Sequence, residues 1–203
     1  MRKTYCIIVL CFFYFGTVAQ SVAVINGQPI TQKEFVWIYK KHRPENTKPT
    51  LTDLVSFLNI YIDFKLKVMD ARESGLDKDS TYIAEVAHYE QALLESVPPE
   101  VRKADFSLVT NEYKEALLLF NISQTKIWDR VEDDEDTIKE YYKAHPEAYH
   151  AQAFEDIKSE VTADYQKQME CGWVTGLRNK YTIKIDLPLL NRLARNTGAQ
   201  IVE

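Results

Sequence analysis

Residues 22–43 read VAVINGQPITQKEFVWIYKKHR, and this stretch decides how the fold begins. A short β-branched run leads into Asn26-Gly27, the dipeptide best suited to a tight turn. Thr31 and Glu34 then have the spacing of a capping box, which predicts that a helix starts at Gln32. The residues that this helix is expected to bury are Phe35, Ile38 and Tyr39.

Downstream of this stretch, apolar residues recur every three or four positions, which is the pattern of amphipathic helices. The chain has only 6 Gly and 7 Pro, few for an all-β fold, and its 45% hydrophobic content excludes a disordered or collagen-like class. Further helices are expected to span about residues 52–74, 80–97, 108–130, 137–145, 154–181 and 189–195.

Two of these helices have a long apolar face. The helix at 80–97 is expected to carry Ile83, Val86, Ala87, Leu93, Leu94 and Val97. The helix at 108–130 is expected to run through Tyr113, Leu117, Phe120, Ile127 and Trp128.

The segment Thr182–Ile185 alternates like a β-strand. Neither it nor Val22–Ile25 has an expected strand beside it in the sequence, and isolated strands are unstable in water. We therefore expect these two segments to pair, which brings the two ends of the folded chain together. The expected fold class is mainly α with a small pairing of N- and C-terminal strands.

The first 19 residues have the features of a secretory signal peptide. Arg2 and Lys3 precede an apolar run from Tyr5 to Phe15 that is too short to span a bilayer as a helix, and small residues lead to an expected cleavage after Ala19. A retained membrane anchor is the alternative. Residues 1–19 are therefore assigned to a signal peptide and residues 20–203 to a single domain.

Without the signal peptide, the chain has 23 Lys and Arg against 30 Asp and Glu, a net charge of −7. Such an acidic chain is a poor candidate for binding nucleic acid or an anionic membrane surface. Cys171 is then the one cysteine left, so neither an internal disulfide nor a thiolate zinc site is expected, while pairing between chains stays open.

No catalytic, cofactor-binding or metal-binding residue is predicted. His145 and His150 flank Glu147, but a spacing of five does not place two ligands on one helix face. The acidic run Asp133–Asp136 matches a calcium loop only in charge, because the turn glycine and the closing Glu are missing. Both groups are expected to be solvated loop residues, with Asp136 favouring the N-terminus of the next helix.

Four segments together resemble the SurA-like periplasmic chaperones, a family whose Bacteroidetes forms are described as peptidylprolyl isomerases. The first is residues 22–43, and the second is LNIYIDFKLKVMDARESGLDKDSTYIAEVAHYEQAL at 58–93. The third and fourth are NEYKEALLLFNISQTKIWDRV at 111–131 and FEDIKSEVTADYQKQMECGWVTGLRNKYTIKI at 154–185. The resemblance implies a helical chaperone module made of an N-terminal half, 20–97, and a C-terminal half, 107–203.

The chain departs from that family between its two halves. Full-length relatives carry one or two parvulin isomerase domains there, and each needs about a hundred residues. Too few residues separate 97 from 107 for such a domain, and the chain has no parvulin-like motif. The resemblance therefore implies a periplasmic chaperone-like protein, not an enzyme, whose partners are unfolded outer-membrane or exported polypeptides, without cofactor and without stable membrane insertion.

Two other functions stay open, a structural or scaffold subunit of an envelope complex and a residual peptidylprolyl isomerase. The abundant tyrosines and tryptophans are expected to be mostly core, with some forming a shallow surface for unfolded segments, but the pattern does not identify peptide-binding residues. The tripeptides that begin at Asp79 and Asp136 place Ser80 and Thr137 in a pattern that Bacteroidetes species glycosylate. Clients, oligomeric state and glycosylation are not predicted.

Overall fold

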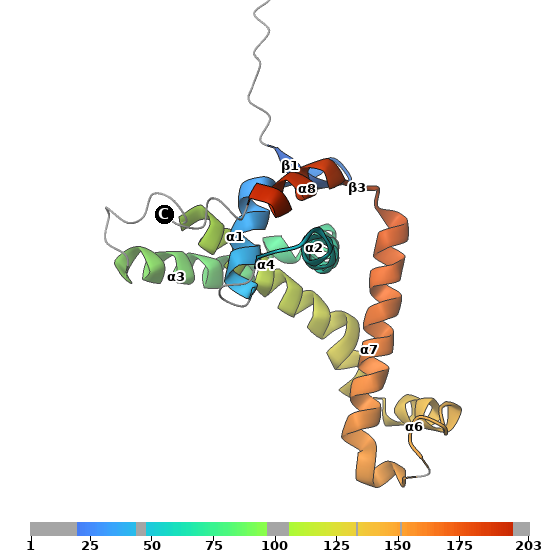
Figure 1. The fold of residues 1–203 in the computed structure, drawn as a ribbon. Coiled ribbons are helices and arrows are strands. Elements are labelled where there is room, and N and C mark those ends of the chain that lie inside the picture. Colours follow the sequence, from blue (N-terminus) through green and yellow to red (C-terminus); the bar gives the residue numbers. More distant parts are fainter. Residues whose placement is uncertain (1–19, 44–47, 97–105, 133, 151, 197–203) are drawn as a thin grey trace, which may run out of the picture.

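The computed structural model describes residues 20–43, 48–96, 106–132, 134–150 and 152–196. The protein is mainly helical with a small three-stranded antiparallel sheet, as the sequence predicts (Figure 1). The predicted signal peptide, residues 1–19, lies outside the described residues, as do Val97 and Asp133.

The elements follow the predicted order closely. The strands are β1 (Ser21–Ile25), β2 (Gln28–Thr31) and β3 (Ile183–Ile185). The helices are α1 (Gln32–His42), α2 (Leu51–Glu73), α3 (Ser80–Ser96), α4 (Phe106–Ser123), α5 (Asp129–Glu132), α6 (Glu135–Ala144), α7 (Phe154–Lys180) and α8 (Leu187–Asn196). A 3₁₀ turn, Leu76–Lys78, follows α2, and a π-helical turn, Gln124–Trp128, joins α4 to α5.

The sheet has the strand order β2-β1-β3 and joins the two ends of the chain. Ala23 pairs with Ile185, and the N–H of Asp186 donates to the carbonyl of Val22 at 2.9 Å. The predicted pairing of the terminal strands is thus confirmed. The expectation that the first strand has no neighbour in the sequence is wrong, because residues 28–31 form β2. Pro29 is compatible with this strand because β2 lies at the edge of the sheet.

Side-chain caps set the helix starts, mostly where the sequence predicts them. Thr31 accepts the N–H of Glu34 at 3.2 Å, and α2 begins one residue before the expected position because Thr50 and Asp53 form a complete capping box. Asp79 accepts the N–H groups of Thr81 and Tyr82 and so begins α3.

The molecule has two parts that differ in shape (Figure 1). The head contains the sheet, α1 to α4, the C-terminal part of α7, and α8. The arm, residues 124–170, contains the π turn, α5, α6 and the N-terminal part of α7, and it extends away from the head.

Three clusters of buried side chains form the core. One lies in the head between the sheet, α1, α2 and α8, and includes Phe35, Leu58 and Leu190. A second lies between α2, α3 and α4, and a third fills the arm. The side chain of Trp173, on α7, packs against all three clusters and therefore lies where the head meets the arm.

The exposed face of α3 differs from the prediction. Tyr82 and Val86 are the buried residues of this helix, whereas Ile83 is 53% exposed and Leu94 is 39% exposed. Ala87 is also exposed. Since α3 packs with only one edge against α2 and α4, part of its predicted apolar face remains in contact with solvent.

The π turn keeps the buried side of the helix at 106–132 continuous. Ile122 and Ile127 are both buried although they are five residues apart, a separation that would turn an α-helix about 140° beyond one full turn. The wider π turn absorbs the extra residue, so that Leu118, Ile122, Ile127 and Val131 all face the core.

Candidate functional site

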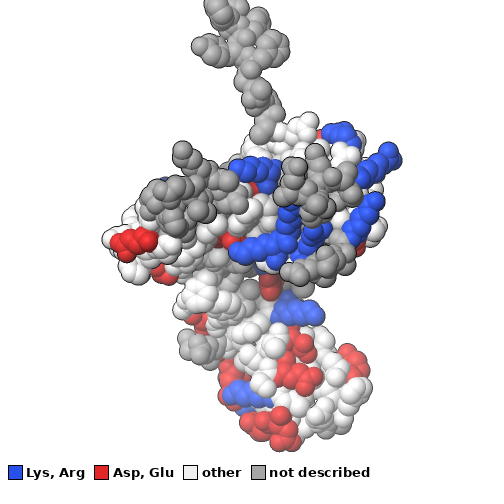
Figure 2. Space-filling view, turned by 60° about the vertical axis from the view of Figure 1, so that its left-hand side comes forward, with Lys and Arg blue, Asp and Glu red and all other residues white. Residues whose placement is uncertain are grey.

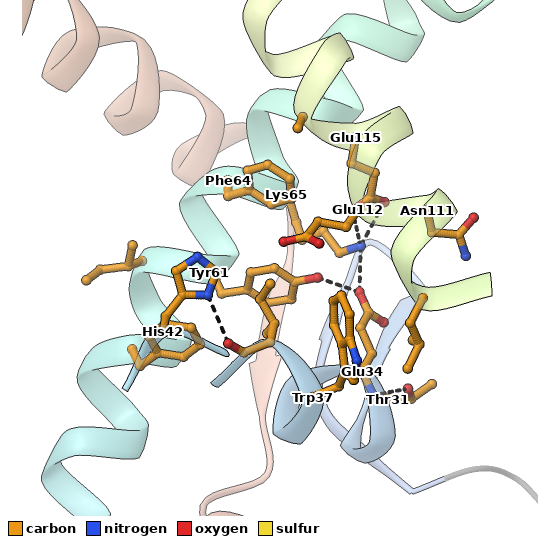
Figure 3. Close-up of a pocket in the computed structure, with 15 residues that line it drawn as sticks. Thr31, Glu34, Trp37, His42, Tyr61, Phe64, Lys65, Asn111, Glu112 and Glu115 are labelled. Atoms are coloured by element: carbon orange, nitrogen blue, oxygen red, sulfur yellow. Dashed lines mark hydrogen bonds and ion pairs between the residues drawn. The ribbon is translucent and has the colours of Figure 1, made fainter. Parts of the chain in front are cut away.

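An open groove of about 510 Å³ lies between α1, α2 and α4 (Figure 3). Its apolar lining comes from three helices: Trp37, Phe57, Ile60, Tyr61, Phe64 and Leu108. The side chain of Ile60 is 68% exposed. Four aromatic rings and exposed aliphatic side chains give the groove walls that fit apolar segments of varied shape. We name this site groove A.

A network of ion pairs fixes the walls of groove A (Figure 3). The Nζ of Lys65 lies 2.7 Å from a carboxylate oxygen of Glu34 and 2.7 Å from one of Glu115. The hydroxyl of Tyr61 donates to Glu34 at 2.7 Å. Glu115 is 8% exposed and also accepts from Arg72 at 3.2 Å. Lys65, on α2, therefore links α1 and α4 through its two ion pairs.

The carboxylate of Glu34 explains why the predicted capping box is only half formed. Its backbone N–H donates to Thr31, but its carboxylate bonds to Tyr61 and Lys65 across the groove. Burial, together with the negative charge of Glu34, raises the pKa of the Tyr61 hydroxyl far above its usual value. The hydroxyl therefore stays protonated and acts as a hydrogen-bond donor that fixes the wall.

A second open groove, of about 450 Å³, lies between α4, the π turn and α7. Its most exposed aromatic residues are Phe120 and Trp128, which are 53% and 39% exposed. Their rings meet edge to face with centroids 5.3 Å apart. The extra residue of the π turn places these two rings, eight positions apart, on one side of the helix. We name this site groove B.

Grooves A and B meet on the surface of α4. The exposed side chain of Ala116 lines both of them. On α2, Phe64 lines groove A and Lys67, one turn further on, lines groove B. The two grooves are thus consecutive along α4, and Ala116, which belongs to both linings, lies at the junction.

The residues considered for metal binding or modification lie elsewhere. His145 packs against Tyr141 with ring centroids 4.2 Å apart, and Asp134 caps α6 by accepting the N–H of Thr137 at 3.0 Å. The described part of the chain has no group of three or more His, Cys, Asp or Glu placed to hold a metal. Cys171 and Ser80 are exposed, and the hydroxyl of Thr137 donates to Asp134.

Neither groove follows from helical periodicity. Periodicity assigns apolar residues to a buried face, so Phe120 and Trp128 look like core residues. One signal was present: Phe120 lies two positions from Leu118 and from Ile122, and such a spacing places it on the far side of a helix from both. Groove A gives no comparable signal, since it depends on how three helices pack.

Comparisons with protein-family models, with curated proteins and with solved structures gave no match to this chain. None of the helices in the described residues has a stretch long and apolar enough to cross a bilayer. The interpretation of the two grooves therefore depends on their geometry and chemistry.

Proposed function

We propose that this protein is a periplasmic chaperone-like protein that binds unfolded outer-membrane or exported polypeptides along grooves A and B and catalyses no reaction. The observation that carries the proposal is the presence of two open, aromatic-lined grooves that meet at Ala116. The signal-peptide features of residues 1–19 support export.

The length of the combined grooves fits an extended chain. Leu108 and Trp128 mark its two ends, and twenty helical residues span about 30 Å. An extended polypeptide covers that distance with about nine residues. Unfolded outer-membrane strands, which alternate apolar and polar residues over about ten positions, have this length and pattern.

The chemistry of the grooves fits reversible binding. Aromatic side chains contact varied apolar groups at low entropic cost, and shallow walls leave the bound chain free to dissociate. The ionisable groups of groove A, Glu34, Lys65 and Glu115, bond to one another and hold the helices in place. Such pairing favours a structural role for these groups over proton transfer.

The test measures aggregation of an unfolded outer-membrane protein as it is diluted from urea. The mature protein is expected to suppress light scattering at equimolar ratio. The double variant Ile60→Gln/Phe120→Gln is expected to lose most of this suppression, because both side chains are exposed in the grooves. Leu187→Gln is the matched control, since Leu187 is 52% exposed on α8 and lines neither groove A nor groove B.

A second experiment tests whether one chain occupies both grooves. Ala116→Arg places a long side chain at the junction without disturbing the helix, and Ala84→Arg makes the same change at an exposed position of α3. Ala116→Arg is expected to weaken binding of a ten-residue aromatic peptide by about tenfold, to the level of its five-residue halves, and Ala84→Arg to leave binding unchanged. Equal binding of the long peptide by both variants would contradict the continuous site.

Other outcomes select the alternatives. If the mature protein suppresses no aggregation but forms one stoichiometric complex with an envelope protein, the structural-subunit alternative replaces the proposal. If it accelerates isomerisation of a prolyl peptide above a heat-inactivated control, the isomerase alternative replaces it.

A further inference from the structure

The charge of this acidic protein is unevenly distributed between the head and the arm. The arm, residues 124–170, contains thirteen Asp and Glu and six Lys and Arg, a net charge of −7. The rest of the chain after residue 19 contains seventeen of each, so the whole negative net charge of that chain belongs to the arm. Figure 2 shows Asp and Glu over the end of the arm and Lys and Arg gathered over the head.

Part of the positive charge of the head belongs to α1, β3 and α8, which lie apart from α6 at the end of the arm (Figure 1). Six exposed cations come from α1, β3 and α8: Lys33, Lys40, Lys41, Lys184, Arg192 and Arg195. We name this surface the basic end. Phe35 of α1 and Leu190 of α8 lie in the same buried cluster, which fixes the two helices to one rigid core.

The acidic groups of the described residues nearest in sequence to these cations, Glu34 and Asp186, bond to groups other than these cations. Glu34, the acidic residue of α1, turns into groove A, where it bonds to Tyr61 and Lys65. Asp186, between β3 and α8, caps α8 by accepting the N–H of Leu189 at 2.8 Å. Lys41 pairs with Glu112 at 2.6 Å, which leaves the cations of β3 and α8 as the less compensated part of the basic end.

The basic end also exposes apolar surface. Leu187, the first residue of α8, is 52% exposed, and it precedes Arg192 and Arg195 on the same short helix. Exposed leucine and arginine on one short helix are a composition found in helices that bind the headgroup region of an anionic bilayer.

We propose that the basic end binds an anionic lipid surface and that the acidic arm points away from it. An extended lipid surface attracts the basic end and repels the arm, so that both charge groups favour the same orientation. An acidic polypeptide that contacts only the basic end is not oriented by repulsion of the arm. This binding is separate from the polypeptide binding proposed for grooves A and B, and it holds whether or not that function is correct.

The test uses the mature protein with sonicated vesicles in a sedimentation assay. It is expected to sediment with vesicles that mix phosphatidylglycerol into phosphatidylcholine and to stay in solution with phosphatidylcholine alone. Binding is expected to weaken as salt is raised, because ions screen exposed charges.

Two triple variants remove the same number of charges from opposite ends. Lys184→Gln/Arg192→Gln/Arg195→Gln alters the basic end, and Arg130→Gln/Lys139→Gln/Lys143→Gln alters the arm. Each cation near an anionic surface contributes about fivefold in affinity, so the first variant is expected to bind roughly a hundredfold more weakly. The second variant is expected to bind with an affinity between that of the unaltered protein and a value a few-fold lower.

Three results would overturn the proposal. Equal losses in the two triple variants would mean that binding depends on total charge and not on the basic end. Equal sedimentation with neutral and anionic vesicles would exclude charge as the cause. Binding to polyglutamate without binding to anionic vesicles would show that the basic end takes an acidic polypeptide instead.

Discussion

The side chain of Trp173 contacts both the head and the arm. Its indole packs against all three buried clusters, and its Nε1–H donates to a carboxylate oxygen of Asp70 at 2.9 Å. The same Asp70 oxygen lies 3.2 Å from the Nζ of Lys126, in the π turn of the arm. Because Asp70 is only 9% exposed, the indole and the ammonium together compensate a buried carboxylate.

Substitution of Trp173 is expected to destabilise the whole protein. Trp173→Ala should cost about 3 kcal/mol of unfolding free energy, because it removes contacts with three clusters and one donor to Asp70. Trp173→Phe, which keeps most of the ring contacts, should cost about 1–2 kcal/mol. Urea unfolding followed by far-UV circular dichroism measures both. Trp37→Ala, at the partly exposed wall of groove A, is the control and should lower the unfolding free energy less than either variant. Equal losses for Trp37→Ala and Trp173→Ala would contradict the connecting role.

At the scale of elements, two glycines are expected to respond to alanine in opposite directions. Gly27 has φ +84° in the β1–β2 turn, where a side chain is strained, so Gly27→Ala should destabilise the protein by about 1 kcal/mol. Gly172 lies within α7, where a Cβ would meet no atom within 4 Å, so Gly172→Ala should stabilise it by about 0.5–1 kcal/mol. Thermal melting of both variants checks the signs, and a stabilising Gly27→Ala would contradict the observed turn.

A second prediction at the scale of elements concerns the extra residue of the π turn. Deleting Thr125, an exposed residue of the turn, would leave Ile122 and Ile127 four positions apart, as an ordinary α-helix requires. The deletion should therefore be tolerated, with a melting temperature lowered by only a few degrees.

Deletion of Gln168 is the matched control. It removes one exposed residue from α7, which has no π turn to absorb the change, and rotates one half of the helix by about 100°. Leu177 and Val161 could then no longer both face their cores. This variant should be largely unfolded by circular dichroism, and a Thr125 deletion that behaves in the same way would contradict the role of the π turn.

Local chemistry explains which elements could be predicted. The starts of α1 and α3 follow from capping side chains that lie within three residues of the backbone groups they satisfy. The strand β2 was missed because Pro29 argues against a strand unless its edge position is known. The π turn was missed because a five-residue interval interrupts the expected helical repeat, and only packing against the arm shows why the interval is needed.

At the scale of the whole molecule, stability is expected to fall in acid. A hydrogen bond from the backbone of Tyr82 lowers the pKa of Asp79, and one from the side chain of Thr137 lowers the pKa of Asp134. Lys139 and Lys158 lower the pKa of Glu135 to about 2. Each pKa is lower in the folded than in the unfolded state. Their stabilising contribution is therefore complete above the unfolded values, near pH 4–4.5, and is lost as the pH falls toward the folded values.

Urea midpoints measured between about pH 6 and pH 2 test this expectation, and they should decrease steadily below about pH 4.5. Asp79→Asn/Asp134→Asn is the control, because asparagine caps helices as well as aspartate but does not titrate. Its midpoint should decrease less steeply. A midpoint that rises in acid would contradict the direction of the pKa shifts.

The candidate binding surface was the part least accessible to prediction. Aromatic abundance indicated that some rings would lie at the surface, but groove A needs α1, α2 and α4 to converge, and Lys65 has to lie between Glu34 and Glu115 from other helices. Net charge likewise does not show where the charges lie in the folded chain. A value of −7 describes the sum for residues 20–203, whereas the folded chain places opposite charges at its two ends.

The pairing of β1 with β3 has a consequence for the order of folding. Ala23 and Ile185 are about 160 residues apart, and Leu189 and Leu190 complete the cluster that contains Phe35. The head core cannot close until nearly the last part of the chain has been synthesised, because the core needs this contact of very high sequence separation. Until then the N-terminal half exposes its own apolar surface, and for that interval it is itself prone to aggregation.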